Sequence, residues 1–324
     1  MKKAQLFFTF LLVLAVQFLH AQEETIFNHY VQSPIILNPG AAGFDDEYQL
    51  QINARAAWTG FDDTPTTLGV RLNGPVGNNF GIGAAVFSET AAQLSRVKGQ
   101  LDVAFRFGFG PQIERNQPAF QAAFGFFTQF QRIQVDASVM DNPIQQAGDE
   151  LLMDYINGVN EFDAGFGLYG SFRKNTFGGI TINNLVSNRL ANITGERTES
   201  GFNYTFLLGH NFDLPELKIK LTPSIMMRNV QNAPYMLDFN LQASFLEEQL
   251  IAGLSYRYLG ALGLLLGTKL ENLRIYYSYD LSFARFQQYN NGTHEITLGY
   301  HLDRNQLKEN QRRKQEQRRS QERR

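Results

Sequence analysis

Side-chain polarity alternates from one residue to the next through most of this chain. In residues 235–245 every odd position is apolar, and the even positions between them are mostly polar. A period of two is the side-chain repeat of a β-strand that has one apolar and one polar face. Residues 47–57, 97–109 and 216–228 repeat the arrangement. The chain must therefore build sheets whose two faces meet different environments.

Counting such segments gives about fourteen strands. They fall near 47–57, 66–72, 80–88, 97–109, 118–130, 162–173, 176–183, 201–212, 216–228, 234–246, 248–259, 261–270, 272–282 and 293–302. Mostly tight turns alternate with long connections at 131–161, 184–200 and 283–292. Strands of about ten residues, short turns on one rim and long loops on the other are typical of outer-membrane barrels. We predict an all-β fold, a transmembrane antiparallel β-barrel of about 14 strands, with both termini in the periplasm.

Two other classes fit the sequence less well. A helical membrane protein would need a further apolar run of about 20 residues after the N-terminal one, and the stretch 259–270 is too short and is broken by glycines. A secreted β-sandwich or propeller would also show alternation, but its core would not tolerate so many inward Arg and Lys residues. The barrel remains the preferred class.

The N-terminal residues have the pattern of a secretory signal peptide. Lys2 and Lys3 precede an apolar run over 6–19, and Ala21 offers a small residue for cleavage. We therefore divide the chain into a signal peptide (1–21), an N-terminal periplasmic or plug segment (22–46), the barrel (47–302) and a basic, polar periplasmic tail (303–324). The absence of cysteine excludes disulfides and thiol nucleophiles.

The segment that precedes the first strand is stiff and has no core periodicity. Ser33-Pro34 and Asn38-Pro39 favour extended conformations before each proline. The segment could fold into the lumen or line the periplasmic mouth, where the prolines would limit the entropy lost on ordering. Alternatively, it is only a periplasmic lead-in to the barrel.

Several short motifs resemble the PorP/SprF family of type IX secretion system outer-membrane proteins. They are Leu37-Asn38-Pro39-Gly40-Ala41-Ala42-Gly43, Arg55-Ala56-Ala57-Trp58-Thr59-Gly60, Thr64-Pro65-Thr66, Thr222-Pro223-Ser224 and His294-Glu295-Ile296. Gly40 stands where the family usually has alanine, and the tail after residue 302 is not part of the family pattern. The resemblance implies a barrel that binds, anchors or helps export a specific large adhesin, in gliding or surface-decorating bacteria.

The resemblance also suggests partners and partner-binding residues. A large secreted adhesin, or its C-terminal sorting domain, is the implied client, and the lipid bilayer surrounds the barrel. The candidate partner-binding residues are Asn38, Pro39, Arg55, Trp58 and Gly60. The sole tryptophan would lie at the outer end of the first strand, where it could anchor the membrane interface or contact the client.

The alternation also predicts which charged side chains face the lumen. The candidates are Arg71, Arg106, Lys218, Lys220, Arg228, Asp238, Arg257, Arg274 and Asp280. Such charges could pair to stiffen a closed barrel, because buried charges need partners. They could instead favour anions or seat an acidic client segment.

No motif for catalysis, cofactor binding or metal binding stands out. Residues 165–170 match GxGxxG, but turn and strand follow, with no helix to receive a pyrophosphate. The predicted parity places His294 on the lipid side and His301 on the lumen side, so the two cannot share a site. We expect no enzyme activity, catalytic residue, cofactor or metal. A general porin or small-solute channel is the alternative function, and a barrel-embedded hydrolase is the third.

The tail from Asp303 to Arg324 holds nine Lys or Arg residues against four Asp or Glu residues. Its composition is typical of a disordered segment or a solvated helix. Nucleic-acid binding would fit the charge but not a periplasmic location. Docking on an acidic periplasmic secretion-system or cell-wall component fits both.

Overall fold

A computed structural model describes residues 27–60, 63–114, 117–141, 150–186, 202–230, 233, 235–258, 260–283, 290–304 and 307. The predicted signal peptide, most of the tail and most of the predicted loops 184–200 and 283–292 lie outside these residues. No helix among the described residues is long and apolar enough to cross a membrane.

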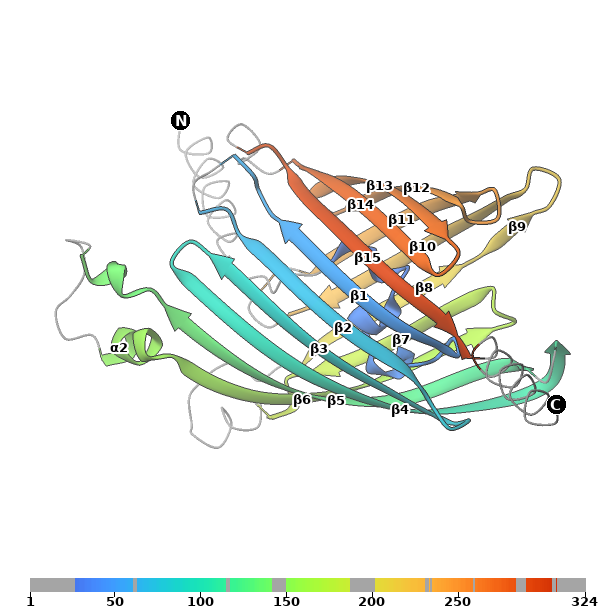
Figure 1. Ribbon diagram of the computed structural model, residues 1–324, viewed down its shortest axis with the longest axis horizontal. Coiled ribbons are helices and arrows are strands. Elements are labelled where there is room, and N and C mark those ends of the chain that lie inside the picture. The colour runs from blue at the N-terminus through green and yellow to red at the C-terminus, as the bar shows by residue number, and fades with distance from the viewer. Residues whose placement is uncertain are drawn as a thin grey trace, which may run out of the picture.

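The described strands form one closed antiparallel barrel (Figure 1). They are β1 (Glu47–Ala56), β2 (Thr66–Val76), β3 (Phe80–Ala91), β4 (Leu94–Glu114), β5 (Gln117–Val135), β6 (Val159–Phe172), β7 (Thr176–Asn183), β8 (Asn203–His210), β9 (Phe212–Leu214), β10 (Ile219–Asn229), β11 (Met236–Phe245), β12 (Leu250–Arg257), β13 (Ala261–Leu270), β14 (Leu273–Ser282) and β15 (Thr293–Asp303). Each strand pairs with its sequence neighbours, except that β8 and β9 both pair with β10 and not with each other, and β1 pairs with β15 to close the sheet. Because β8 and the short β9 pair with successive parts of β10, the barrel has fourteen strands and one extra segment, which confirms the predicted fold.

The side chains face the two sides of the wall as the alternation predicted. In β1, Gln49, Gln51 and Asn53 are buried, whereas Leu50 and Ile52 are each 41% exposed on the outer surface. The inward set is polar and the outward set is apolar, which is the arrangement of a barrel in lipid. A register slip of one residue would exchange the two sets.

The wall of the barrel is much taller on one side than on the other. β4 has 21 residues and β5 has 19, whereas β7 and β8 have eight each. The predicted loop 131–161 is correspondingly shorter, because strand pairing continues to Leu94↔Val135. The 3₁₀-helix η5 (Ala137–Asp141) and the helix α2 (Glu150–Asn157) lie at the far end of this tall side (Figure 1).

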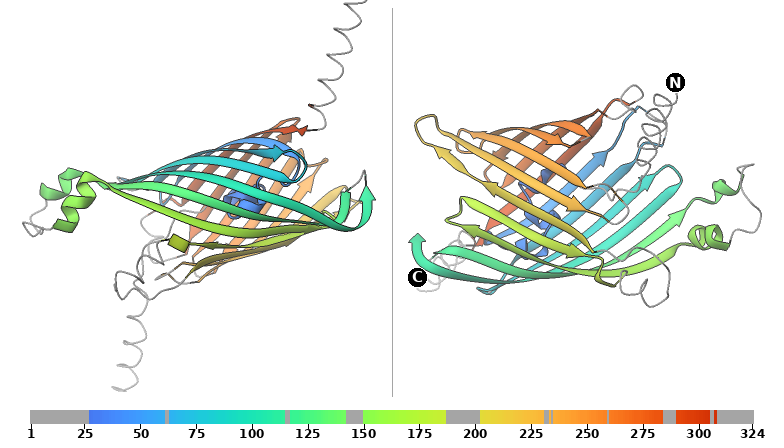
Figure 2. Two further views of the ribbon diagram at one scale, coloured as in Figure 1. Left: turned by 90° about the horizontal axis from the view of Figure 1, so that it is seen from below. Right: turned by 180° about the vertical axis from the view of Figure 1, so that it is seen from behind.

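The two ends of the barrel differ, and we name them for what they carry. Glu47 of β1 pairs with Asp303 of β15 at one end, which we call the terminal rim. The opposite end carries the β1–β2 connection with Trp58, together with η5 and α2, and we call it the loop rim. Both views of Figure 2 show α2 projecting beyond the barrel wall.

Residues 27–46, which we call the lumen segment, lie inside the barrel (Figure 2). They form three short 3₁₀-helices, η2 (Asn28–Tyr30), η3 (Pro34–Ile36) and η4 (Pro39–Ala41). Proline occupies the first position of η3 and of η4, where its fixed φ suits a helical turn and its missing N–H costs nothing. The prolines that excluded strand structure therefore begin the turns that compact the segment.

Candidate functional site

The turn at Asn38–Gly40 packs against a part of the wall that has no side chains. A Cβ atom added at Gly125 of β5 would lie 2.2 Å from the backbone nitrogen of Gly40, and one added at Gly167 of β6 would lie 2.4 Å from Asn38 Oδ1. Gly179 of β7 faces the Asn38 amide in the same way, with a Cβ distance of 2.6 Å. These three glycines form a hollow that only backbone can line. We call Gly125, Gly167 and Gly179 the glycine hollow.

Asn38 is held in the glycine hollow by hydrogen bonds to the wall. Its side-chain nitrogen donates to the carbonyl oxygens of Leu168 (2.9 Å) and Ile180 (3.1 Å), and its Oδ1 accepts from the Gly40 nitrogen (2.8 Å). The GxGxxG match at 165–170 thus lies in strand β6, and Gly167 receives the chain's own asparagine. A turn and strand β7 follow the motif.

Two arginines from the wall bind carbonyl groups of the lumen segment. Arg71 of β2 donates to the Ile35 oxygen at 3.0 Å and lies 3.6 Å from the Asp102 carboxylate. Arg106 of β4 donates to the Gly43 oxygen at 2.6 Å and the Phe44 oxygen at 3.1 Å. Both side chains point inward and donate to backbone carbonyl groups of the lumen segment, and these bonds tie the segment to the wall.

Carboxylates on the opposite wall bind the start of the lumen segment. Glu295 of β15 accepts from the Asn28 backbone nitrogen (2.9 Å), and Asp280 of β14 accepts from the Asn28 amide (2.6 Å). Arg257 of β12 donates to Asn28 Oδ1 (2.9 Å) and to Asp238 of β11 (3.3 Å). One asparagine is therefore held by three strands that lie far from it in sequence.

His29 is fully buried between the segment and the wall. Its Nδ1 lies 2.7 Å from Thr297 Oγ1 and 3.2 Å from Glu295 Oε1. Burial lowers the pKa of His29 below its usual value, although Glu295 and Asp280 act in the opposite direction and Arg55 adds to the lowering.

This cluster does not have the geometry of a catalytic triad. The hydroxyl and the carboxylate approach the same ring nitrogen of His29, whereas a triad needs them on opposite nitrogens. Among the described residues, no group of three or more His, Cys, Asp or Glu side chains could hold a metal ion.

Apolar side chains inside the barrel complete the seat of the lumen segment. Tyr30 packs on Leu207 of β8 and Met226 of β10, and Phe44 meets Tyr169 of β6 edge-on at 4.9 Å between ring centroids. The sequence analysis missed these wall residues. They were detectable as apolar side chains at inward positions of otherwise polar faces, where a water-filled lumen would favour polar residues.

The remaining predicted lumen charges lie at both ends of the barrel, with one correction. Near the terminal rim, Arg274 of β14 contacts Glu47 at 3.0 Å and Lys220 pairs with Glu248. Arg228 is buried on the inner face of β10, at the end of that strand nearer the loop rim. Lys218 was predicted to face the lumen, but it lies exposed in the turn before β10 with φ +53°. The strand alternation cannot apply to Lys218, because pairing of β10 begins only at Ile219.

The candidate partner-binding residues fall into two separate places. Asn38 and Pro39 are buried in the glycine hollow, and Arg55 points inward to Glu295 at 3.1 Å. Trp58 is 51% exposed at the loop rim, and Gly60 lies beside it with φ +104°. The structure therefore does not bring all five residues to one surface.

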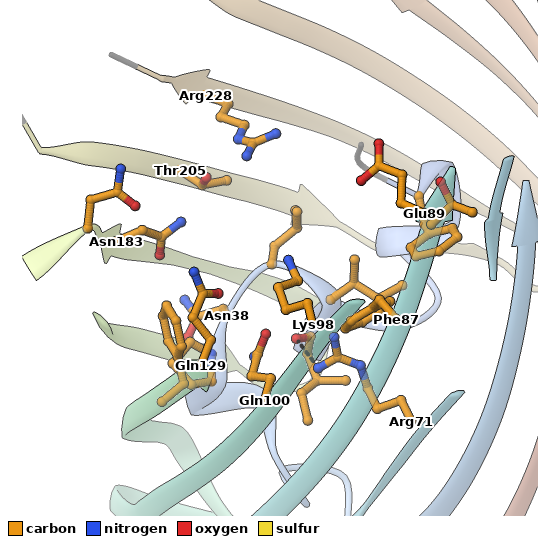
Figure 3. Close-up of a pocket in the computed structure, with 18 of the residues that line it drawn as sticks. Asn38, Arg71, Phe87, Glu89, Lys98, Gln100, Gln129, Asn183, Thr205 and Arg228 are labelled. Carbon is orange, nitrogen blue, oxygen red and sulfur yellow. Dashed lines mark hydrogen bonds between the residues drawn. The ribbon is translucent and has the colours of Figure 1, made fainter. Parts of the chain in front are cut away.

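A cavity lies between the lumen segment and the loop rim (Figure 3). Residues 35–39 of the segment line it on one side, and inward side chains of β2, β3, β4, β5, β7, β8 and β10 line the others. Four cations are among the described lining residues, namely Arg71, Arg96, Lys98 and Arg228, against the single carboxylate of Glu89.

Similar solved structures include the TodX deltaS2S3 mutant monoaromatic hydrocarbon channel (10% identity, 88% of this chain and 97% of that chain, TM-score 0.49). Another is the Ralstonia pickettii toluene transporter TbuX (9% identity, 82% and 91%, TM-score 0.47), and a third is the Acinetobacter baumannii outer membrane protein Omp33 (8% identity, 80% and 99%, TM-score 0.42). No curated protein matches the chain.

The family comparison covers most of the chain. The model of the family described as "Type IX secretion system membrane protein PorP/SprF" matches residues 19–300, which include all the described strands except the last residues of β15. The resemblance first seen in short motifs thus extends through the whole barrel. The chain belongs to the PorP/SprF family of type IX secretion system membrane proteins.

Proposed function

We propose that this barrel binds, anchors or helps export one specific large surface adhesin, and that it is a binding protein rather than an enzyme. The observation that carries the proposal is the lumen segment, which occupies the barrel interior and contacts both walls. Asn28 is bound by β12, β14 and β15, while Asn38 is bound by β6 and β7. Such a barrel is better suited to holding a partner than to conducting solutes.

The general porin is the weaker alternative for the same reason. Porins keep a water-filled lumen, whereas here Tyr30, Ile35 and Ala42 form apolar contacts inside the barrel. Opening a channel would require these buried groups to leave the wall together. Purified protein in a planar bilayer should therefore show no steady open conductance.

We further propose an orientation in which the terminal rim faces the periplasm and the loop rim faces outward. The longest connections gather at the loop rim with Trp58, where exposed polar loops commonly grip partners. The signal peptide would be removed at residue 21. The basic tail would then meet an acidic periplasmic secretion-system or cell-wall component.

Protease treatment of intact cells tests this orientation. The connections within 131–161, 184–200 and 283–292 should be clipped, while the tail after residue 303 should be cut only when the outer membrane is broken. Cleavage of the tail in intact cells would reverse the assignment.

The functional test removes most of the lumen segment and leaves every strand in place. Deletion of residues 23–40, with the leader kept, should leave a barrel that still inserts and still migrates as a folded species on unheated gels. Mass spectrometry of peptides shaved from the cell surface should then show the loss of one large protein. Unchanged surface proteins with altered uptake of small solutes would instead support the porin.

Substitutions at Arg55 and Trp58 provide a second, independent test. Alanine at both Arg55 and Trp58 should reduce display of the same surface protein. Alanine at His294, which lies on the outer face and contacts Tyr277, is the matched control. Equal effects would show that Arg55 and Trp58 have no special part in binding the client.

A further inference from the structure

The cavity on the loop-rim side of the lumen segment has an ordered basic wall. Arg96 and Lys98 are successive inward residues of β4, and Gln100 follows them on the same face. Residues two apart on a strand are separated by about 7 Å. The wall therefore presents two cations and an amide at a regular spacing along one line.

Neighbouring side chains hold these cations in place. The Lys98 ammonium lies 5.2 Å from the centre of the Phe87 ring, and the Arg71 guanidinium lies 5.4 Å from the same ring. Arg96 lies 3.4 Å from Glu89. Cation–π contacts of this kind fix the position of a charged side chain, so Lys98 and Arg71 are held beside the cavity.

Arg228 adds positive charge from the opposite wall. Figure 3 shows its side chain entering the cavity from β10, across from Arg71 and Lys98. The carboxylate of Asp102, which contacts Arg71 at 3.6 Å, does not line the cavity. Among the residues that the structure describes, the four lining cations exceed the carboxylates of Glu89 and Asp102 by two. The cavity is therefore an anion-attracting site in a partly enclosed place.

The polar neutral residues indicate the class of anion. Gln100, Gln129 and Asn183 line the cavity, and each amide can donate and accept hydrogen bonds, as a peptide backbone also does. The same barrel already holds a peptide in this way, since Asn38 and Thr181 bond to backbone carbonyl groups across the seat of the lumen segment. Acidic residues at alternate positions of an extended peptide would match the spacing of Arg96 and Lys98.

We propose that this cavity binds an extended acidic peptide segment of the secreted client, with carboxylates at alternate positions that meet Arg96 and Lys98. The inference rests on the proposed function and names the chemistry of the client segment. The ion pairs form in a partly enclosed site, where salt screens them less than at an open surface.

Peptide binding to the purified full-length barrel tests the inference. The probe is a synthetic peptide with four Glu–Thr repeats, and the matched neutral peptide has four Gln–Thr repeats. The acidic peptide should bind more tightly, and its affinity should fall as salt rises. The double variant R96Q/K98Q should weaken that binding by about tenfold or more, because two charge pairs are lost. R173Q/K174Q removes two charges from an exposed turn on the terminal rim and should bind like the wild type.

Three results would overturn the inference. The first is equal binding of the two peptides, and the second is unchanged binding of the acidic peptide by R96Q/K98Q. The third is tighter binding of an acidic oligosaccharide, such as an oligogalacturonate, than of the acidic peptide. The comparison of the two peptides on the wild-type barrel holds even if the double variant fails to fold. Normal surface display by a folded R96Q/K98Q variant would refute the site but not the proposed function, whereas normal display by a strain lacking the whole barrel would refute the function.

Discussion

A single methyl group at Gly125 should dislodge the lumen segment without harming the wall. In the structure, a Cβ atom there would lie 2.2 Å from the Gly40 nitrogen and 2.3 Å from the Pro39 carbonyl carbon. The three nearest atoms all belong to the lumen segment. Alanine is otherwise better than glycine within a strand, so G125A should weaken the docking of the segment and leave β5 intact.

The size of the effect follows from the bonds that must break. To reach ordinary contact distance, the turn must retreat by about 1 Å, which would lengthen the bonds from Asn38 to Leu168 and Ile180 beyond useful geometry. Losing these two bonds costs about 2 kcal/mol, and looser packing of Phe44 on Tyr169 adds about 1 kcal/mol. A total of about 3 kcal/mol should raise the population of the undocked segment roughly a hundredfold.

Hydrogen exchange measured by mass spectrometry reports this population directly. Peptides from residues 27–46 should exchange faster in G125A, while peptides from β5 and β6 should keep their protection. G99A is the control, because a Cβ atom at Gly99 would meet nothing within 4 Å. Unchanged exchange in G125A, or equal acceleration in G99A, would refute the tight fit. Loss of protection in β5 and β6 would show that the wall itself was damaged.

Three further outcomes follow from the same structure. F239R places a charge on the outer face, where Phe239 is 44% exposed. Near the membrane midplane, this charge should lower the free energy of unfolding of the barrel by about 2–4 kcal/mol. N240R on the inner face should lower it clearly less in the same denaturant titration. Because burial holds the pKa of His29 below its unfolded value, the neutral ring's contribution is present at neutral pH and is lost as pH falls below about 6.5. The protection factors of residues 27–33, which are corrected for the pH dependence of intrinsic amide exchange, should therefore fall between pH 6.5 and 5 in the wild type and stay flat in H29Q. Shortening the connection between η5 and α2 should leave the barrel's melting temperature unchanged, because the closed β-sheet does not include it.

The wall of the barrel was predictable from the sequence because polar and apolar residues alternate within each strand's own sequence. Polar residues alternate with apolar ones wherever one face meets lipid, so the strands near 47–57 and 234–246 could be placed to within a residue or two. The errors fell where periodicity ends. Lys218 was assigned to a strand that begins only at Ile219, and β5 runs to Val135, beyond its predicted end at 130.

The interior was harder to predict because its contacts join residues that are distant in sequence. Nothing near Asn38 reveals that it will meet glycines in β6 and β7, since no local repeat records such a pairing. Apolar residues at inward positions, such as Leu207 and Met226, were the available signal. They indicate that something other than water fills the lumen, but they do not identify what fills it.

The contacts of Asn28 also set an order of assembly. Its backbone nitrogen binds Glu295, which lies 267 residues further along the chain, and its side chain binds Asp280 on the strand before. Those two strands are the last to be synthesised, and the final one must also pair with β1 to close the sheet. Asn28 must therefore wait for the last two strands before its binding site is complete. Docking of the segment therefore depends on closure of the barrel, so an incompletely inserted barrel would leave its N-terminal segment undocked and open to proteases.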